Sequence, residues 1–348
     1  MTIRVLVVDD SAFIRHALVM MLESDPHIKV VGSAKDGREA VEKAAALKPD
    51  VITMDVEMPG MDGIAALKQI MAARPVPVIM LSSLTLDGAR VTFDALDLGA
   101  VDFIPKNLSD IAVDIIGIKK VLIEKVKAVA NQEGASMQPN RPPSPASLRV
   151  AIPPRITAAR KVSIVAIGTS TGGPKALQDI LPRLPANFPV PIVIAQHMPA
   201  NFTKPFAERL DQLSQLAVKE AEDGEPIKSG IAYVAPGRGH MQLVRGRTGE
   251  SLIRVSVNED FIYRPSVDFL MMSVAELYSA RALGVILTGM GNDGLKGLSA
   301  MKKCGSRILA QNEASCVVYG MPKAVVEAGI ADKVVGIDAM ADEIINFL

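Results

Sequence analysis

Short apolar runs alternate with helical patterns along the first 125 residues of the chain. Apolar residues between the runs recur at the three- and four-residue spacing of amphipathic helices. The runs with the length of buried strands are Ile3–Val8, Ile28–Gly32, Val51–Met54, Val76–Leu81 and Val101–Ile104. The helical patterns cover Ala12–Leu22, Gly37–Leu47 and Gly63–Ala73. Five strands that alternate with helices predict a doubly wound parallel sheet in a domain of residues 1–125.

The alternating pattern stops beyond this first domain. Residues 131–160 are rich in proline, serine, alanine and arginine. Proline cannot continue a helix or donate to a sheet, so residues 126–160 are predicted to form a semi-extended linker. A flexible linker of about 30 residues holds its ends on the order of 30 Å apart, which lets two domains touch or separate.

A second α/β domain is predicted for residues 161–348, where the alternation restarts. Its strand-like runs are Val162–Ile167, Pro191–Ala195, Ile231–Val234, Leu283–Leu287 and Arg307–Ala310. Residues 241–257 instead resemble a hairpin, with Arg247-Thr248-Gly249 at the turn. We therefore expect a doubly wound, mainly parallel sheet with a small antiparallel addition.

Composition and charge narrow the class of protein. Hydrophobic residues make up 49% and charged residues 22% of the chain, as in globular proteins. The 38 basic residues balance the 38 acidic ones, so no overall basic field draws the chain to nucleic acid or anionic lipid. Without a long uncharged apolar run or a secretion signal, a cytoplasmic protein with no direct membrane insertion is expected. The two cysteines, Cys304 and Cys316, predict neither a disulfide framework nor a zinc site.

Polar residues follow four of the predicted strands in the first domain. The carboxyl ends of parallel strands meet at one edge of the sheet, so these side chains are expected to gather there. Three carboxylates at one edge repel one another unless a hard cation such as Mg²⁺ lies among them. A cation, a lysine and a hydroxyl around a carboxylate make a site for a phosphoryl group. The residues are Asp9, Asp10, Asp55, Ser82, Ser83 and Lys106.

The first domain resembles the response-regulator receiver domain, a flavodoxin-like fold. The resemblance is carried by Val7-Val8-Asp9-Asp10, the segment from Met54 to Gly63 (MDVEMPGMDG) and Phe103-Ile104-Pro105-Lys106. It implies that Asp55 accepts phosphate from a partner histidine kinase and that Asp9 and Asp10, with Asp55, bind Mg²⁺. It also implies that Ser82 and Lys106 bind phosphoryl oxygens and that Phe103 is the aromatic that changes environment on activation. Receivers usually carry proline directly after the lysine, whereas Asn107 stands there in this chain.

A glycine-rich segment opens the second domain directly after its first predicted strand. It reads Gly168-Thr169-Ser170-Thr171-Gly172-Gly173 and allows two interpretations. A glycine-rich loop at the start of a helix can bind phosphate, although the lysine and hydroxyl of a nucleotide-binding loop are missing. Alternatively, Gly-x-Ser-x-Gly is the tight turn that exposes a nucleophilic serine above a sheet.

A serine nucleophile needs a base and a carboxylate that orients the base. In the second domain, His197 and His240 are the candidates for the base, and His197 is favoured because it directly follows a strand-like run. Asp293 lies in a glycine-rich segment past another such run, so the three side chains are expected at one sheet edge. The chain order Ser–His–Asp differs from that of the α/β-hydrolases, so their fold is not inferred.

The second domain resembles the catalytic domain of chemotaxis protein-glutamate methylesterases, whose architecture is receiver, linker and catalytic domain. The resemblance implies that Ser170 is the nucleophile, His197 the base and Asp293 its orienting carboxylate. Thr171, Gly172 and Met290 are then expected to line the site, with backbone N–H groups for the oxyanion. The family demethylates glutamate methyl esters on methyl-accepting chemotaxis receptors and deamidates certain receptor glutamines. We expect Mg²⁺ in the receiver and no metal for the ester step. The segments that match are residues 168–174, 196–199, 234–237, 287–294 and 319–322.

Three alternatives remain open on the sequence. The glycine-rich loop could serve a phosphate- or nucleotide-binding output module, which would leave His197 without a role. A DNA-binding output would need a basic helix-turn-helix, and the second half offers no candidate. The chain could also be a scaffold without activity that keeps the motifs. In the enzyme hypothesis, the unphosphorylated receiver covers the catalytic cleft, and phosphate on Asp55 loosens this contact.

Overall fold

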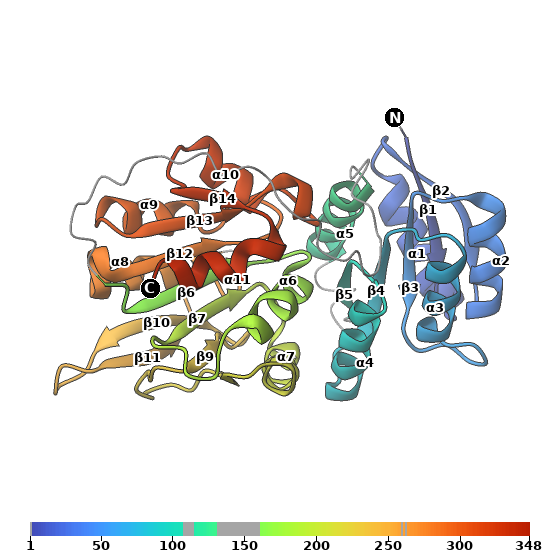
Figure 1. The fold of residues 1–348 in the computed structure, drawn as a ribbon. Helices are drawn as coiled ribbons and strands as arrows, with labels where there is room; N and C mark the ends of the chain where they lie inside the picture. Colours follow the sequence, from blue (N-terminus) through green and yellow to red (C-terminus); the bar gives the residue numbers. More distant parts are fainter. Residues whose placement is uncertain (1, 107–114, 131–160, 259, 262) are drawn as a thin grey trace.

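The protein consists of two α/β lobes that lie side by side (Figure 1). A computed structural model describes residues 2–106, 115–130, 161–258, 260–261 and 263–348. Residues 131–160 of the predicted linker and Asn107 lie outside the described residues. Helix α5 (Ile115–Ala130) extends five residues into the range 126–160 that was expected to be linker. No helix in the described part of the chain has the length and apolar character needed to cross a bilayer.

The N-terminal lobe is a five-stranded parallel sheet with the order β2-β1-β3-β4-β5. Helices α1 (Ala12–Glu23) and α5 pack on one face through one apolar cluster. The other face carries α2 (Gly37–Leu47), α3 (Gly63–Ala73) and α4 (Leu86–Asp97). Helices α1 to α4 each begin after a Ser, Asp or Thr whose side chain accepts an N–H of the first turn. The strands are β1 (Ile3–Val8), β2 (Ile28–Ala34), β3 (Val51–Asp55), β4 (Val78–Ser83) and β5 (Asp102–Lys106).

The C-terminal lobe contains a seven-stranded parallel sheet with the order β14-β13-β12-β6-β7-β9-β8. One face packs against α6 (Gly173–Ile180), α7 (Ala200–Leu213) and α11 (Ile337–Asn346). The other packs against α8 (Val267–Tyr278), α9 (Leu295–Lys303) and α10 (Met321–Glu327). An antiparallel hairpin, β10 (His240–Arg245) and β11 (Ser251–Ser256), packs against α8. The strands are β6 (Ile164–Thr169), β7 (Ile192–Gln196), β8 (Ala217–Glu220), β9 (Ile231–Val234), β12 (Ala282–Ile286), β13 (Arg307–Gln311) and β14 (Lys333–Val335).

The predicted fold class is confirmed in both lobes, including the hairpin. The sequence analysis missed β8 and β14, the two edge strands of the second sheet. Both are short and have one buried residue each, so they lack the continuous apolar run by which the buried strands were recognised. Short 3₁₀ helices complete the lobe at Leu181–Arg183, Ser279–Arg281 and Glu313–Ser315.

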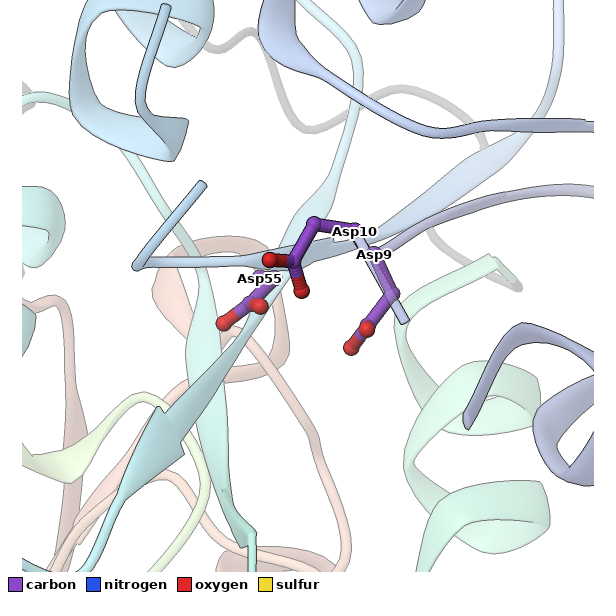
Figure 2. A group of neighbouring side chains, drawn as sticks. All are labelled: Asp9, Asp10 and Asp55. Atoms are coloured by element: carbon purple, nitrogen blue, oxygen red, sulfur yellow. The ribbon is translucent and has the colours of Figure 1, made fainter. Parts of the chain in front are cut away.

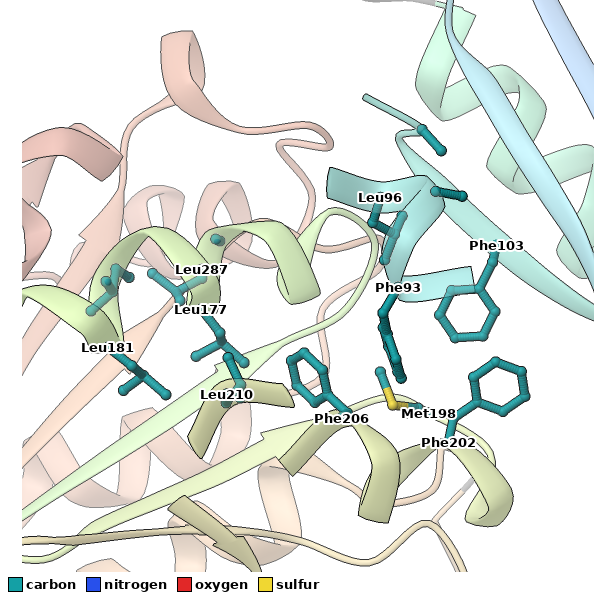
Figure 3. Packing of buried hydrophobic residues seen from close by; sticks show 14 of the residues in the cluster. Phe93, Leu96, Phe103, Leu177, Leu181, Met198, Phe202, Phe206, Leu210 and Leu287 are labelled. Carbon is teal, nitrogen blue, oxygen red and sulfur yellow. The ribbon is translucent and has the colours of Figure 1, made fainter. Parts of the chain in front are cut away.

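One apolar core continues from the first lobe into the second (Figure 3). Phe93 on α4 lies 5.3 Å from Phe206 on α7, measured between ring centroids. Phe103 on β5 stacks on Phe202 at 4.6 Å. Aromatic pairs at such distances add to the free energy gained from burial. Phe202 and Phe206 both lie on α7, which begins three residues after His197. The contact between the lobes is therefore close in sequence to His197.

Candidate active site

In the second sheet, the direction in which successive strands are added reverses between β6 and β12. From β6 the chain moves outward to β7 on one side, and later to β12 and β13 on the other. Crevices at the carboxyl ends of strands on either side of such a switch point are where open α/β sheets bind ligands. Ser170 follows β6, His197 follows β7 and Asp293 lies in the loop after β12, so the fold brings all three to this crevice.

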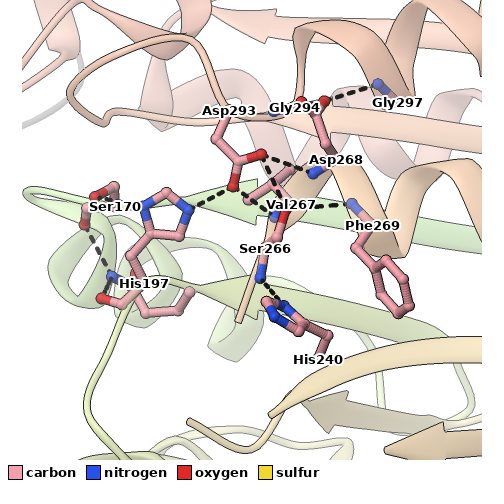
Figure 4. A network of polar contacts seen from close by, with 11 residues as sticks. Ser170, His197, His240, Ser266, Val267, Asp268, Phe269, Asp293, Gly294 and Gly297 are labelled. Atoms are coloured by element: carbon pink, nitrogen blue, oxygen red, sulfur yellow. Dashed lines mark hydrogen bonds and ion pairs between the residues drawn. The ribbon is translucent and has the colours of Figure 1, made fainter. Parts of the chain in front are cut away.

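The three side chains form a continuous chain of contacts (Figure 4). Ser170 Oγ lies 3.1 Å from His197 Nδ1, and His197 Nε2 lies 2.7 Å from Asp293 Oδ2. A carboxylate accepts, so the neutral imidazole places its proton on Nε2 and leaves the Nδ1 lone pair for the serine hydroxyl. The arrangement can take a proton from Ser170 and stabilise the resulting imidazolium.

The Asp293 carboxylate is held by the amino terminus of α8. Val267 N–H donates to Oδ2 at 2.7 Å, and Asp268 N–H and the Ser266 hydroxyl donate to Oδ1 at 3.0 and 3.1 Å. Burial alone raises the pKa of Asp293, but His197 and these amides outweigh it and hold the pKa below its usual value. Asp293 is therefore ionised and fixed in position.

Glycine shapes the loop that carries Ser170. Gly172 has φ +76°, and a Cβ there would lie 2.4 Å from Val317 Cβ. The Ser170 N–H donates to the Thr288 carbonyl at 3.0 Å, so it is not free to bind an oxyanion. The N–H groups of Thr171, Gly172 and Met290 have no acceptor among the described residues and are the candidates for that role.

Tyr263 stacks on His197, with ring centroids 4.7 Å apart and planes 8° apart. Burial first, and then the nearby Glu124 and Asp293, raise the pKa of the Tyr263 phenol. The sequence analysis missed this residue because it lies in an irregular segment without strand or helix periodicity.

His240, the other candidate base, lies beside the start of α8 and makes no hydrogen bond to Ser170. It is fully buried, its Nδ1 accepts the Ser266 N–H at 3.1 Å, and its Nε2–H donates to the Asn258 carbonyl at 3.0 Å. Burial lowers the pKa of His240, so the ring is neutral. His240 therefore supports the start of α8, and its two nitrogens have partners other than Ser170.

The first lobe gathers charged side chains at the carboxyl edge of its own sheet (Figure 2). Asp9, Asp10 and Asp55 offer carboxylate oxygens that all lie within 4.8 Å of one another. Lys106 Nζ lies 2.5 Å from Asp9 and 2.6 Å from Asp55. Burial, which outweighs the effect of Lys106, raises the pKa of Asp55 to about 6.

Comparisons with known proteins identify both lobes. The model of the response regulator receiver domain matches residues 5–114, and that of the CheB methylesterase matches residues 165–344. The protein-glutamate methylesterase/protein-glutamine glutaminase 1 of Oleidesulfovibrio alaskensis is 51% identical over 99% of this chain and 99% of its own length. The chain belongs to the CheB methylesterase family.

Further similar proteins agree with this assignment. The protein-glutamate methylesterase/protein-glutamine glutaminase of Lawsonia intracellularis is 49% identical, with 99% of each chain covered. The solved structure of the Thermotoga maritima CheB methylesterase catalytic domain matches with a TM-score of 0.53 and 45% identity. That match covers 54% of this chain and 100% of the Thermotoga chain. The predicted class, a carboxylic ester hydrolase with a receiver domain, is confirmed at the level of the family.

The carboxylate cluster of this CheB family member fits a divalent cation. Lys106 pairs with two of the three carboxylates, those of Asp9 and Asp55, so two negative charges in the cluster stay uncompensated when all are ionised. Carboxylate oxygens are the ligands that Mg²⁺ prefers. Asp9 is fully buried and Asp55 is 4% exposed, so solvent does little to screen their repulsion.

The two serines at the end of β4, Ser82 and Ser83, differ in where their hydroxyls lie. Ser82 is fully buried, and its hydroxyl donates to the Gly88 carbonyl at 3.1 Å and accepts from Thr92 at 2.7 Å. Ser83 lines the cavity of about 700 Å³ that contains Asp55 and Lys106. In this conformation Ser83 is the hydroxyl at the cavity wall, and Ser82 would have to leave its present partners to bind a phosphoryl oxygen.

Proposed function

We propose that this chain is a phosphorylation-activated hydrolase that demethylates glutamate methyl esters on methyl-accepting chemotaxis receptors. The same site would deamidate certain receptor glutamines. The observation that carries the proposal is the chain of contacts from Ser170 through His197 to Asp293, at the switch point of the sheet, in a member of this family.

The reaction is acyl transfer through an ester on Ser170. As Ser170 Oγ attacks the γ-carbonyl carbon of the substrate, its proton passes to His197 Nδ1. The imidazolium keeps its Nε2–H on Asp293 and gives the Nδ1 proton to the leaving methoxy oxygen, or to the leaving nitrogen of a glutamine. Methanol or ammonia departs. Water then attacks the acyl-enzyme as His197 takes its proton, and the imidazolium returns that proton to Ser170 Oγ as the ester bond breaks, which leaves a glutamate side chain on the receptor.

The negative charge that develops on the carbonyl oxygen needs donors at the site. Two loops that flank Ser170 supply the candidate N–H groups, at Thr171 and Gly172 on one side and at Met290 on the other. Removing one such donor typically costs about 10²–10³ in rate.

Replacing Ser170 tests the proposal. Ser170→Ala is expected to abolish methanol release from methylated receptor membranes and covalent labelling by a fluorophosphonate. Ser214→Ala is the matched control, because the Ser214 hydroxyl also lies in the second lobe and has no hydrogen-bond partner among the described residues. Near-normal turnover by Ser170→Ala would refute the proposed mechanism. Absence of labelling in the unaltered protein would favour the phosphate-binding alternative.

Phosphate on Asp55 would control the esterase. A partner histidine kinase is the proposed donor, and Asp9, Asp10 and Asp55 would hold Mg²⁺, which supplies positive charge against the phosphoryl oxygens. Lys106, at 2.6 Å from Asp55, would bind a phosphoryl oxygen, and the Ser82 hydroxyl, at the end of β4, would bind another after leaving Gly88 and Thr92.

In the unphosphorylated form the receiver would restrict access to the ester site. A cavity of about 660 Å³ between α5 and the second lobe is lined by Lys119, Lys120, Tyr263 and Met290. The Asn201 side chain donates to the Leu84 carbonyl at 2.7 Å, which joins the start of α7 to the loop after Ser82 and Ser83. Movement of that loop on phosphorylation would therefore act on the helix that follows His197.

A further inference from the structure

Gln196 is the last residue of β7 and directly precedes His197. Its side chain is 2% exposed. Its amide nitrogen donates to the carbonyl oxygen of Ser170 at 3.0 Å and to the carbonyl oxygen of His197 at 3.0 Å. One buried side chain thus bridges the main chains that carry the hydroxyl and the imidazole.

The direction of the Gln196 amide follows from its partners. Carbonyl oxygens only accept, so the NH₂ group must face them. The amide oxygen Oε1 is left buried without a hydrogen-bond partner among the described residues. An unpaired buried acceptor lowers stability, and methionine, which is similar in size, would avoid that loss. Packing alone therefore does not account for glutamine at this position, whereas the two donated bonds do.

The loop after Ser170 leaves room for this amide. A Cβ on Gly173 would lie 2.1 Å from Gln196 Oε1 and 2.3 Å from Thr169 Oγ1, so only glycine fits beside them. The Gly173 N–H also donates to the Ser170 carbonyl, at 2.8 Å. Two donors therefore fix the Ser170 carbonyl, and with it the direction in which the side chain leaves the main chain.

We propose that Gln196 is a positioning residue of the esterase reaction. Its amide holds the main chains of Ser170 and His197 together, so that Oγ and Nδ1 keep the 3.1 Å separation needed for proton transfer. This inference rests on the proposed function, because it concerns the two groups that exchange the proton there. Misplacement by about 1 Å can cost on the order of 10² in rate.

The test compares two buried glutamines in the same lobe. Gln196→Met removes both donated bonds with little change in volume. Gln178→Met on α6 is the matched control, since Gln178 is 8% exposed and neither its oxygen nor its nitrogen has a hydrogen-bond partner among the described residues. We expect Gln196→Met to lower kcat for methanol release about 10- to 100-fold with KM within about two-fold. Gln178→Met should leave both unchanged.

Fluorophosphonate labelling separates positioning from a loss of folded protein. Positioning predicts that Gln196→Met labels to full stoichiometry at a rate reduced about as much as kcat. A wild-type labelling rate and kcat in Gln196→Met would overturn the inference, as would reduced stoichiometry with an unchanged rate per active site. Gln196→Glu is measured in parallel. Its carboxylate cannot donate to the two carbonyl oxygens and repels them, so its kcat and labelling rate are expected to be at least as low as those of Gln196→Met. Failure of the unaltered protein to release methanol would instead contradict the proposed function.

Discussion

Two buried aspartates in this protein have opposite pKa shifts. Asp293 accepts bonds from three groups at the start of α8 and from His197, and its pKa is lowered although it is buried. Asp55 has Lys106 and the Glu57 N–H as partners and faces the charge of Asp9, and its pKa is raised to about 6. Burial raises the pKa of both carboxylates, and the donors and charges around each decide whether that effect is outweighed, as it is at Asp293, or not, as at Asp55. Asp293 is thereby kept charged, whereas Asp55 binds a proton more readily than an ordinary aspartate.

Asp55→Asn tests this difference through stability. The folded-state pKa of about 6 lies above the ordinary value of 3.8, so ionised Asp55 destabilises the fold above pH 6. With EDTA present, the Asn variant is expected to unfold at higher urea concentration than the unaltered protein at pH 8, by up to about 3 kcal/mol. The gain should shrink as the pH falls below 6 and vanish at about pH 3, which is below the ordinary value of 3.8, so that Asp55 is protonated in both states. Circular dichroism measures the transition.

Glu42→Gln is the control for the loss of one negative charge, because Glu42 is exposed on α2. It should change stability by less than about 0.5 kcal/mol at every pH. An Asp55→Asn variant that is less stable than the unaltered protein at pH 8 would contradict the account of Asp55.

At the scale of elements, α8 and α9 cap each other. Asp293, just before α9, accepts hydrogen bonds from N–H groups at the start of α8. Asp268, in the first turn of α8, accepts hydrogen bonds from the N–H groups of Gly294 and Gly297, at 2.9 and 2.8 Å. Gly294, the residue before α9, has no side chain with which to cap that helix. The helix pair therefore fixes the carboxylate that orients His197, because each helix end depends on the other.

Asp268→Ala is expected to weaken this pair. Losing the cap should lower the free energy of unfolding by about 1–2 kcal/mol. Because Gly294 follows Asp293 directly, kcat for methanol release should also fall. Asp268→Asn keeps an acceptor oxygen and is expected to lie closer to the unaltered protein in both measurements. Unchanged stability and kcat in Asp268→Ala would show that α9 does not need this cap.

The sequence predicted most buried strands and the edge at which polar residues collect, because strand length and hydrophobic runs are local properties. It also singled out Ser170, His197 and Asp293, and in the structure His197 contacts both of the others. It could not predict the contacts of Gln196, Tyr263 or Asp268. Those contacts depend on strand order and loop geometry, which join residues more than 20 positions apart and leave no local pattern.

At the scale of the whole molecule, the two lobes meet along α4 and α7. Arg209 on α7 forms ion pairs with Asp94, at 3.4 Å, and Asp97 on α4. These charges border the aromatic contact of Phe93 with Phe206. The two lobes thus share one interface of apolar and charged contacts, and α7, which begins three residues after His197, lies in it.

Arg209→Glu is expected to raise methanol release in the absence of phosphate. The change sets a carboxylate against Asp94 and Asp97, and losing about 1 kcal/mol of interface energy shifts the closed–open equilibrium about five-fold. Arg183→Glu is the matched control, since Arg183 pairs with Asp342 inside the second lobe, at 3.2 Å. Equal basal rates in both variants would contradict the blocking model.

The aromatic contacts between the lobes have a consequence for any form in which the lobes separate. If the lobes separate, water reaches the buried phenyl rings of Phe93, Phe202 and Phe206. Exposed aromatic surface promotes association between protein molecules. A form in which the lobes are separated is therefore expected to bind apolar dyes and to self-associate at high concentration.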